Sequence, residues 1–217
     1  VNNLMDIQKY EAGKTVLQKT SFNFSSFIRE MYHSFESVAD NREIRFVLDN
    51  ELPETYKVCF DEAEIEKVFF NLLSNAFKFT PSEGQVTIRV NTVTQAECEH
   101  FPAQYSSILI EAGYLFIEVI DTGKGFSEQE AEKIFEPFYR SQEDIHRQIS
   151  GTGIGLSLTR SIILQHNGCI WTESSETEGT RFMFLLPDTE KQEEGKNESP
   201  VLSKSAEISK KFDLLVE

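Results

Sequence analysis

The stretch DEAEIEKVFFNLLSNAFKFTP, residues 61–81, decides the fold. Its apolar residues recur at three- and four-residue spacing, which predicts an amphipathic helix over 61–79. An aspartate with glutamates just after it predicts the start of the helix, and the proline at its end predicts where it stops. A second stripe on this helix is polar and consists of Asn71, Asn75 and Lys78, at i, i+4 and i+7 spacing. A solvated helix face is the simplest interpretation of such a stripe.

The residue types in this stripe also allow a chemical interpretation. Asparagine carbonyls coordinate Mg²⁺ without adding negative charge beside a polyphosphate, and a nearby lysine meets phosphates as a point charge. The stripe is therefore a candidate site for a metal-bound phosphate ligand.

The rest of the chain mixes helical and strand patterns without strict alternation. Further helices are predicted at 23–40 and 155–166, and strands at 44–48, 86–90, 115–120, 170–172 and 181–186. The expected fold class is α/β (α+β), a two-layer sandwich in which a mixed sheet of about five strands packs under about three helices. One domain is predicted over 21–187, followed by a polar linker over 188–211.

Composition excludes several classes of function. The 217 residues include 36 acidic and 21 basic ones, a formal charge of -15, so a nucleic-acid partner is not expected. The three cysteines form no CxxC pair, and no apolar stretch approaches the length that spans a bilayer, which favours a reducing, cytoplasmic setting. A polyanionic ligand would need backbone N–H groups, a cation and a few placed side chains.

The motif DTGKGF, residues 121–126, directly follows a predicted strand. An ordinary turn is one interpretation. The functional one makes Asp121 the acceptor for an exocyclic amino group such as that of adenine, while Gly123 and Gly125 let the base approach the backbone. Lys124 is expected to face solvent.

The motif GTGIGL, residues 151–156, leads from a polar segment into a predicted helix. It could be a flexible loop, but glycines at a helix start also form an anion cradle of free N–H groups at the positive end of the helix dipole. The pattern is neither a Rossmann nor a Walker motif, because the final glycine and the GK[ST] sequence are missing.

Four motifs taken together, NLLSNAFKFTP, DTGKGF, FEPFYR and GTGIGL, resemble the N, G1, F and G2 boxes of sensor histidine kinases in order and spacing. The wider superfamily includes DNA gyrase B, Hsp90 and MutL. The resemblance implies a Bergerat-type (HATPase) ATP-binding domain that uses ATP and Mg²⁺. It implies a protein-histidine kinase that donates the γ-phosphate of ATP to a histidine on an upstream dimerisation helix.

The resemblance also implies roles for individual residues. Asn71, Asn75 and Lys78 would be catalytic, and Asn75 would be the Mg²⁺ ligand. Many relatives have tyrosine where this chain has Phe79, so a hydroxyl contact is lost there. Phe135 to Arg140 would begin an ATP lid that continues to residue 150. The residues implied to contact the nucleotide are Asn75, Lys78, Phe79, Asp121, Gly123, Gly125, Arg140, Gly151, Thr152, Gly153, Ile154, Gly155, Leu156 and Thr180.

Among the proteins that this chain resembles, the residue type at position 71 distinguishes kinases from hydrolases. Water-splitting relatives carry a glutamate base four residues before the Mg²⁺ asparagine, and Asn71 cannot act as a base. Transfer to a protein acceptor is therefore expected. The histidines of this chain, His33, His100, His146 and His166, lack the sequence setting of a phosphoacceptor.

The ends of the chain suggest its context. Residues 1–20 resemble the end of a dimerisation helix and its link, and 212–217 resemble the start of a receiver domain, with a docked C-terminal tail as the alternative. The implied whole is a homodimeric hybrid sensor, of which this chain would be a cytoplasmic portion, with a response-regulator receiver domain as partner. Alone, the chain is expected not to autophosphorylate. Two alternatives stay open: a nucleotide sensor without phosphotransfer, and a serine kinase or ATPase of the same fold.

Overall fold

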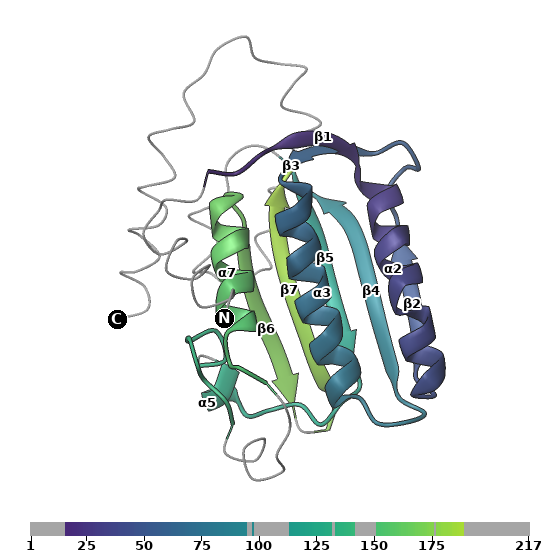
Figure 1. Cartoon of the computed structure of the whole chain (residues 1–217), viewed down its shortest axis with the longest axis vertical. Helices are drawn as coiled ribbons and strands as arrows, with labels where there is room; N and C mark the ends of the chain where they lie inside the picture. The colour runs from purple at the N-terminus through teal and green to yellow at the C-terminus, as the bar shows by residue number, and fades with distance from the viewer. Residues whose placement is uncertain are drawn as a thin grey trace.

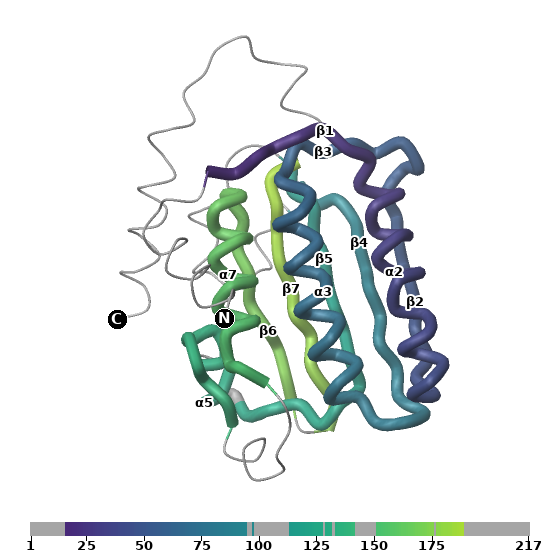
Figure 2. Tube along the Cα trace, in the orientation of Figure 1, coloured from purple at the N-terminus to yellow at the C-terminus, as the bar shows by residue number. Residues whose placement is uncertain are grey.

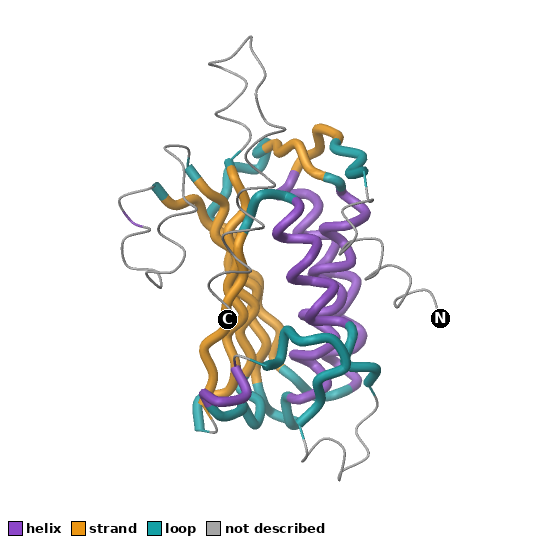
Figure 3. Tube along the Cα trace, turned by 90° about the vertical axis from the view of Figure 1, so that its left-hand side faces the viewer, coloured by secondary structure: helices purple, strands orange, loops and turns teal. Residues whose placement is uncertain are grey.

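The computed structural model describes residues 16–94, 97, 113–131, 133–141, 151–175 and 177–188. In this part of the chain a mixed sheet is covered on one face by a layer of three long helices (Figures 1 and 3). This confirms the expected two-layer α/β sandwich. The expectations for the helix end before residue 16, for the lid beyond residue 141 and for the receiver-like 212–217 lie outside the described residues.

The main sheet has the strand order β2-β4-β5-β7-β6. Strand β2 runs parallel to β4, and the other neighbouring pairs are antiparallel. Each strand overlaps one of the five predicted segments and extends beyond it at one end or both, although residue 44 lies just before β2. Pairing with a neighbour also orders residues whose own pattern is weak. The bounds are β2 Arg45–Asn50, β4 Gln85–Val93, β5 Tyr114–Asp121, β6 Cys169–Ser175 and β7 Gly179–Pro187.

The three long helices are α2 Phe24–Asn41, α3 Glu62–Phe79 and α7 Gly155–Gln165. The side chain of Asn23 caps α2 by accepting the N–H of Ser26, and Asp61 caps α3 by accepting the N–H of Glu64. Helix α3 lies between the other two and runs opposite to α7, so the end of α3 and the start of α7 lie at the same end of the molecule (Figure 2).

Three short elements were not predicted from the sequence. Strands β1 Thr20–Asn23 and β3 Lys57–Phe60 form a separate antiparallel pair at one end of the helix layer, and α5 Glu128–Ala131 follows the DTGKGF motif (Figure 1). Four residues give too little periodicity to distinguish a strand from a loop. The β1–β3 pairing joins residues 34 to 40 positions apart, so only the tertiary structure defines it.

The main core between helices and sheet is rich in phenylalanine. Phe69 of α3 contacts Phe24 and Phe27 of α2 on one side and Phe184 of β7 on the other, with ring centroids 5.7–6.3 Å apart. These distances are typical of favourable aromatic packing. The helix α3, which carries the polar stripe, is thus anchored to both layers.

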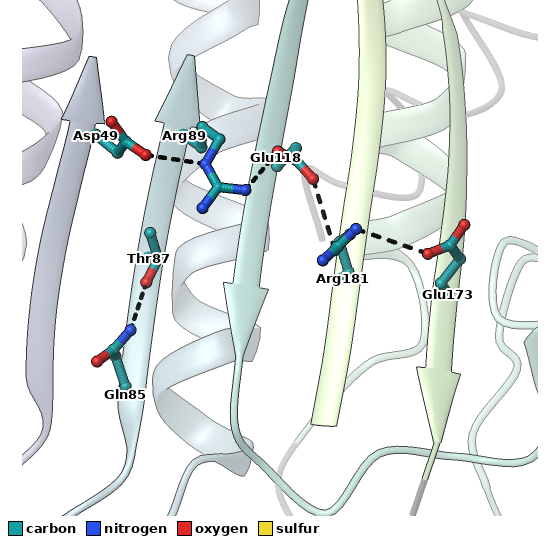
Figure 4. Close-up of polar contacts among 7 residues, drawn as sticks. All are labelled: Asp49, Gln85, Thr87, Arg89, Glu118, Glu173 and Arg181. Atoms are coloured by element: carbon teal, nitrogen blue, oxygen red, sulfur yellow. Dashed lines mark hydrogen bonds and ion pairs between the residues drawn. The ribbon is translucent and has the colours of Figure 1, made fainter. Parts of the chain in front are cut away.

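The other face of the sheet carries a row of alternating charges across all five strands (Figure 4). Glu118 of β5 is 4% exposed and pairs with Arg89 of β4 at 3.2 Å and Arg181 of β7 at 3.5 Å. The row ends at Asp49 of β2 and Glu173 of β6. Because two guanidinium groups flank it, the buried carboxylate is compensated, and the row fixes neighbouring strands without entering the helix-covered face.

Candidate functional site

The polar stripe of α3 lies on its C-terminal half, facing neither the centre of the core nor open solvent. The side chains of Asn71, Asn75, Lys78 and Phe79 are all half-buried. The core face of the helix is formed instead by its fully buried apolar residues. Half-burial leaves these polar groups reachable by a ligand while restricting their rotamers.

Asn71 joins α3 to the GTGIGL motif. Its side-chain amide donates to Thr159 Oγ1 on α7 at 2.9 Å. A Cβ added to Gly155 would overlap the Oδ1 atom of Asn71, so only glycine fits at that position of α7. The first asparagine of the stripe therefore bridges two helices. Its amide N–H is engaged, in keeping with the expectation that Asn71 does not act as a base.

Lys78 brings positive charge to the same place. A Cβ on Gly151 would lie 3.2 Å from Lys78 Nζ, so the lysine lies beside the first glycine of the loop. Its Nζ also lies 4.7 Å from the centre of the Phe79 ring, and Lys124 Nζ lies 5.5 Å from that ring. The prediction that Lys124 faces solvent is wrong, since its side chain is half-buried at this ring. Two cations are thus concentrated here in a chain of charge -15.

Asp121 ends strand β5 and is 3% exposed. Its Oδ1 accepts the N–H of Gly123 at 2.8 Å, and its carboxylate also accepts the N–H of Thr180. Burial nevertheless raises its pKa to about 6, because the two N–H groups only partly offset the loss of water. A buried carboxylate held by neutral donors alone is suited to accept a hydrogen bond from a ligand amino group.

The glycines of DTGKGF allow close packing between protein segments, and their expected place beside a base stays a prediction. A Cβ on Gly123 would lie 2.6 Å from Asp121 Oδ1 and 2.7 Å from the carbonyl oxygen of Phe79. Gly125, at φ +60°, would overlap the carbonyl oxygen of Ser175. Protein atoms fill the space where each Cβ would lie, so the absence of a side chain lets the N box, the G1 box and the β6–β7 turn pack together.

The start of α7 is left open for an anion. Its N-cap position is Ile154, no side chain among the described residues caps it, and its first turn carries no acidic residue. The side chains of Ile154 and Leu156 pack into the main core, so only their backbone groups could face a ligand. Thr152, just before the helix, is exposed. Free N–H groups at a helix start attract phosphate.

The FEPFYR motif contacts the same loop. Phe138 N–H donates to the carbonyl of Gly153 at 2.8 Å, and Gly153, at φ +71°, leaves no room for a Cβ beside Phe138. Phe135 packs on Phe182 in the core, whereas Phe138 is 59% exposed. Phe135 is therefore part of the core, whereas Phe138 is not. Arg140 is half-buried.

A metal ion at this site would depend on few protein ligands. Within the described residues no group of three or more His, Cys, Asp or Glu side chains could hold a metal. Mg²⁺ commonly keeps several waters and binds through one or two protein oxygens plus substrate phosphates. The half-buried carbonyl of Asn75 fits that requirement.

A groove of about 460 Å³ lies at the other end of the helix layer, between α2 and the start of α3. Its lining includes the acidic residues Glu30, Asp61, Glu62 and Glu66. This charge would repel phosphates, so the groove is not a second site for the same ligand.

All four motifs meet at one end of the molecule. Comparison with known proteins identifies the family to which a chain with this arrangement belongs. Residues 60–190 match the family described as histidine kinase-, DNA gyrase B-, and HSP90-like ATPase. The chain belongs to this ATPase family. It is the catalytic ATPase domain of a two-component sensor histidine kinase, as its relatives indicate.

Two curated relatives of this ATPase domain are sensor kinases. The autoinducer 2 sensor kinase/phosphatase LuxQ of Vibrio parahaemolyticus is 30% identical over 187 residues, 86% of this chain and 20% of LuxQ. The circadian input-output histidine kinase CikA of Synechococcus elongatus is 31% identical over 189 residues, 87% of this chain and 23% of CikA. The chain thus spans about a fifth of the length of these relatives.

Solved structures of histidine kinases share the fold of this ATPase domain. The catalytic domain of histidine kinase ThkA superposes with a TM-score of 0.63 at 29% identity, covering 81% of this chain and 99% of that domain. ThkA in complex with the response regulator protein TrrA superposes with a TM-score of 0.62 at 26% identity, covering 88% of this chain and 48% of ThkA. None of the helices in the described part of this chain has both the length and the hydropathy needed to cross a bilayer.

Sequence reasoning missed two residues of this ATPase site. Thr159 is 1% exposed and receives the Asn71 amide, and a polar residue on the apolar side of α7 was the available signal. Lys124 is the second, and its position inside a glycine turn of a strongly acidic chain was the signal there.

Proposed function

We propose that this ATPase domain binds Mg-ATP between α3, the end of β5 and the start of α7, and donates the γ-phosphate to a histidine of an upstream dimerisation domain. The observation that carries the proposal is Asp121. Its carboxylate is 3% exposed, is held by two backbone N–H groups, and has a pKa raised to about 6. An exocyclic amino group of adenine would supply the donor that such a carboxylate favours.

The other residues of the site then have complementary tasks. Phe79 offers an apolar surface to the base, and the N–H groups of Gly155 and its neighbours offer donors to the phosphates. Lys78 balances phosphate charge from beside Gly151. Asn75 would hold Mg²⁺, which neutralises developing charge on the phosphates when it is bound. Arg140, Thr152 and Thr180 would be further contacts of the nucleotide.

The absence of a base on α3 beside the site favours phosphotransfer over hydrolysis. Asn71 donates to Thr159, and the acidic residues of α3 are Glu62, Glu64 and Glu66, within two turns of its opposite end. An activated water therefore has no carboxylate on α3 to take its proton. A histidine acceptor needs no such base in this domain, and it would come from the upstream helices.

The wider context of the domain belongs to the same proposal. The partners would be the upstream dimerisation domain of the same homodimeric protein and a response-regulator receiver domain. The printed description of the ThkA complex names a response regulator as the bound partner of ThkA. The whole protein would be a hybrid, membrane-bound sensor with this domain on the cytoplasmic side. The chain spans about a fifth of the length of its curated relatives, which leaves room for such further domains.

The adenine assignment can be tested by calorimetric titration with Mg-ATP and Mg-ITP, since the hypoxanthine base of ITP lacks the amino group. Asp121→Asn should weaken ATP binding about 10- to 100-fold, the range of a hydrogen bond to a charged group. It should also remove the preference of the unchanged chain for ATP over ITP. Asp49→Asn, on the other face of the sheet, is the matched control and should change neither affinity.

Two outcomes would contradict the site. Equal ATP affinity of Asp121→Asn and the unchanged chain would remove Asp121 from it, and equal binding of ATP and ITP would remove the amino-group contact. Phosphotransfer is tested separately by fusing the domain to its upstream helices and following acid-labile, base-stable phosphate. ATP binding without such phosphate would replace the kinase with a nucleotide sensor.

A further inference from the structure

We propose that Asp61 is a positioning residue that couples the leading segment, residues 16–19, to the nucleotide site. The inference deepens the proposed function, on which it rests, by assigning a route through which the nucleotide site responds to the chain preceding it. Asp61 caps the start of α3, whereas Asn75, Lys78 and Phe79 lie in its last turns.

Asp61 uses three different atoms to hold three segments. Its Oδ2 accepts the N–H of Gln18 in the leading segment at 2.7 Å. Its Oδ1 accepts the N–H of Glu64 at 3.3 Å and so caps α3. Its own N–H donates to Nε2 of His166, just after α7, at 3.1 Å. The leading segment and the ends of both site helices therefore meet at one residue.

His166 is built as a neutral acceptor for this contact. It is 1% exposed, and its Nδ1 must donate to the carbonyl of Ile162 at 2.8 Å, which leaves the lone pair of Nε2 for Asp61. Burial lowers its pKa, and Lys19 lowers it further, while the Ile162 bond, Asp61 and Glu64 act in the opposite direction. Both ring nitrogens are thus satisfied in one tautomer.

Helices α3 and α7 connect the hydrogen bonds at Asp61 to the end of the molecule that bears the nucleotide site. An 18-residue helix is about 27 Å long and is a stiff element, so a shift at Asp61 moves Asn75 and Lys78 as a body. Helix α7 likewise joins His166 to Gly155. The Asn71–Thr159 bond ties α3 and α7 partway along, so both respond together.

Helix α2 shows that a side-chain cap does not need bonds to the leading segment and to a second helix, as Asp61 has. Asn23 accepts the N–H of Ser26 at 2.9 Å and donates to the carbonyl of Glu54 at 2.7 Å, and α2 carries none of the site motifs. In both caps a side-chain oxygen accepts the N–H three residues on, but of the two only Asp61 joins the leading segment to helices that bear the nucleotide site.

Coupling between two places is reciprocal, so it can be measured from the nucleotide side. In the unchanged chain, saturating Mg²⁺ and a non-hydrolysable ATP analogue should alter amide exchange at Gln18 by about fivefold or more, the lower range of measured couplings. Asp61→Ser keeps a capping oxygen for Glu64 but has no second oxygen for Gln18. Its Gln18 exchange should not respond to nucleotide. Asn23→Ser, the matched control, should keep the full response.

The outcomes separate this inference from the proposed function. Nucleotide binding without any response at Gln18 in the unchanged chain overturns the coupling alone, as does a full response in Asp61→Ser. No nucleotide binding in the unchanged chain overturns both proposals. If Asp61→Ser does not fold, Asp61→Asn replaces it, because one amide oxygen cannot serve Gln18 and Glu64 as two carboxylate oxygens do.

Discussion

Helices α3 and α7 begin in opposite ways. The start of α3 has an aspartate cap, two glutamates in its first turn and a buried histidine that accepts the Asp61 N–H. The start of α7 has no described side-chain cap and no acidic residue in its first turn. Carboxylates stabilise a helix start, and they would also repel phosphate there. The first arrangement therefore favours stability, and the second suits the phosphate binding proposed for it.

The same contrast extends to the carboxylate beside each helix end. Asp61 has three hydrogen-bonded neighbours, including the helix it caps. Asp121 is buried at the nucleotide end, where two N–H groups do not fully offset its loss of water. A site that awaits a ligand donor is expected to cost the free protein some stability.

The largest expected effect follows from Asp121. A pKa raised from 3.8 to about 6 means that stability from this group is fully present below pH 3.8 and is lost as pH rises through 6. Asp121→Asn removes the ionised form and should raise the free energy of unfolding at pH 7 by about 3 kcal/mol, while it weakens ATP binding. Urea unfolding at pH 7 and pH 4 measures this. A gain that is equal at both pH values would contradict the ionisation argument.

Adding a side chain at the start of α7 should have the next largest effect. Gly155→Ala would usually stabilise a helix, but here the new Cβ meets Asn71 Oδ1, so we expect a loss of about 1–3 kcal/mol and weaker ATP binding. Chemical unfolding and calorimetry measure both effects. Gly151→Ala is the control, because its Cβ meets only the flexible end of Lys78. Adding Asn71→Ala should recover part of the lost stability, and strict additivity of the two changes would contradict the contact.

Removing the cap of α3 should affect the free energy of unfolding more than the affinity for nucleotide. Asp61→Ala loses the bonds from Glu64 and Gln18, and we expect the free energy of unfolding to fall by about 1 kcal/mol. Glu62→Ala removes only a first-turn charge and should cost about 0.3 kcal/mol. Thermal unfolding of the two variants side by side tests the difference. Equal losses would mean that Asp61 acts through its charge alone.

Placing an acidic residue before α7, as at the start of α3, should have the smallest effect. Thr152→Asp places a carboxylate on an exposed position before α7, and we expect ATP to bind about fivefold more weakly at low salt. The loss should shrink in 0.5 M salt because exposed charges are screened. Thr152→Asn is the uncharged control. A loss independent of salt would point to shape rather than charge.

Local sequence patterns predicted most of the fold. The spacing of Ile65, Val68, Leu72 and Ala76 and the aspartate at the start of α3 specify backbone conformation within a few residues. The long helices and the strands of the main sheet followed from patterns of this kind. The short strands β1 and β3 did not follow, because each becomes a strand only by pairing with the other. The candidate site followed from the order of four motifs, whereas Lys124 and Thr159 entered it only through packing.

The sequence by itself determined the long helices and the strands of the main sheet, where α3 and its stripe lie, and that this chain resembles histidine kinase ATPase domains. The tertiary structure decided how α3 and α7 begin: that His166 completes the start of one, and that Asn71 occupies the space beside Gly155 in the other. The physical reason is the separation along the sequence over which each kind of interaction acts. Caps and periodicity act over a few residues, whereas these contacts join residues 84 to 105 positions apart and exist only once the helices pack on one sheet.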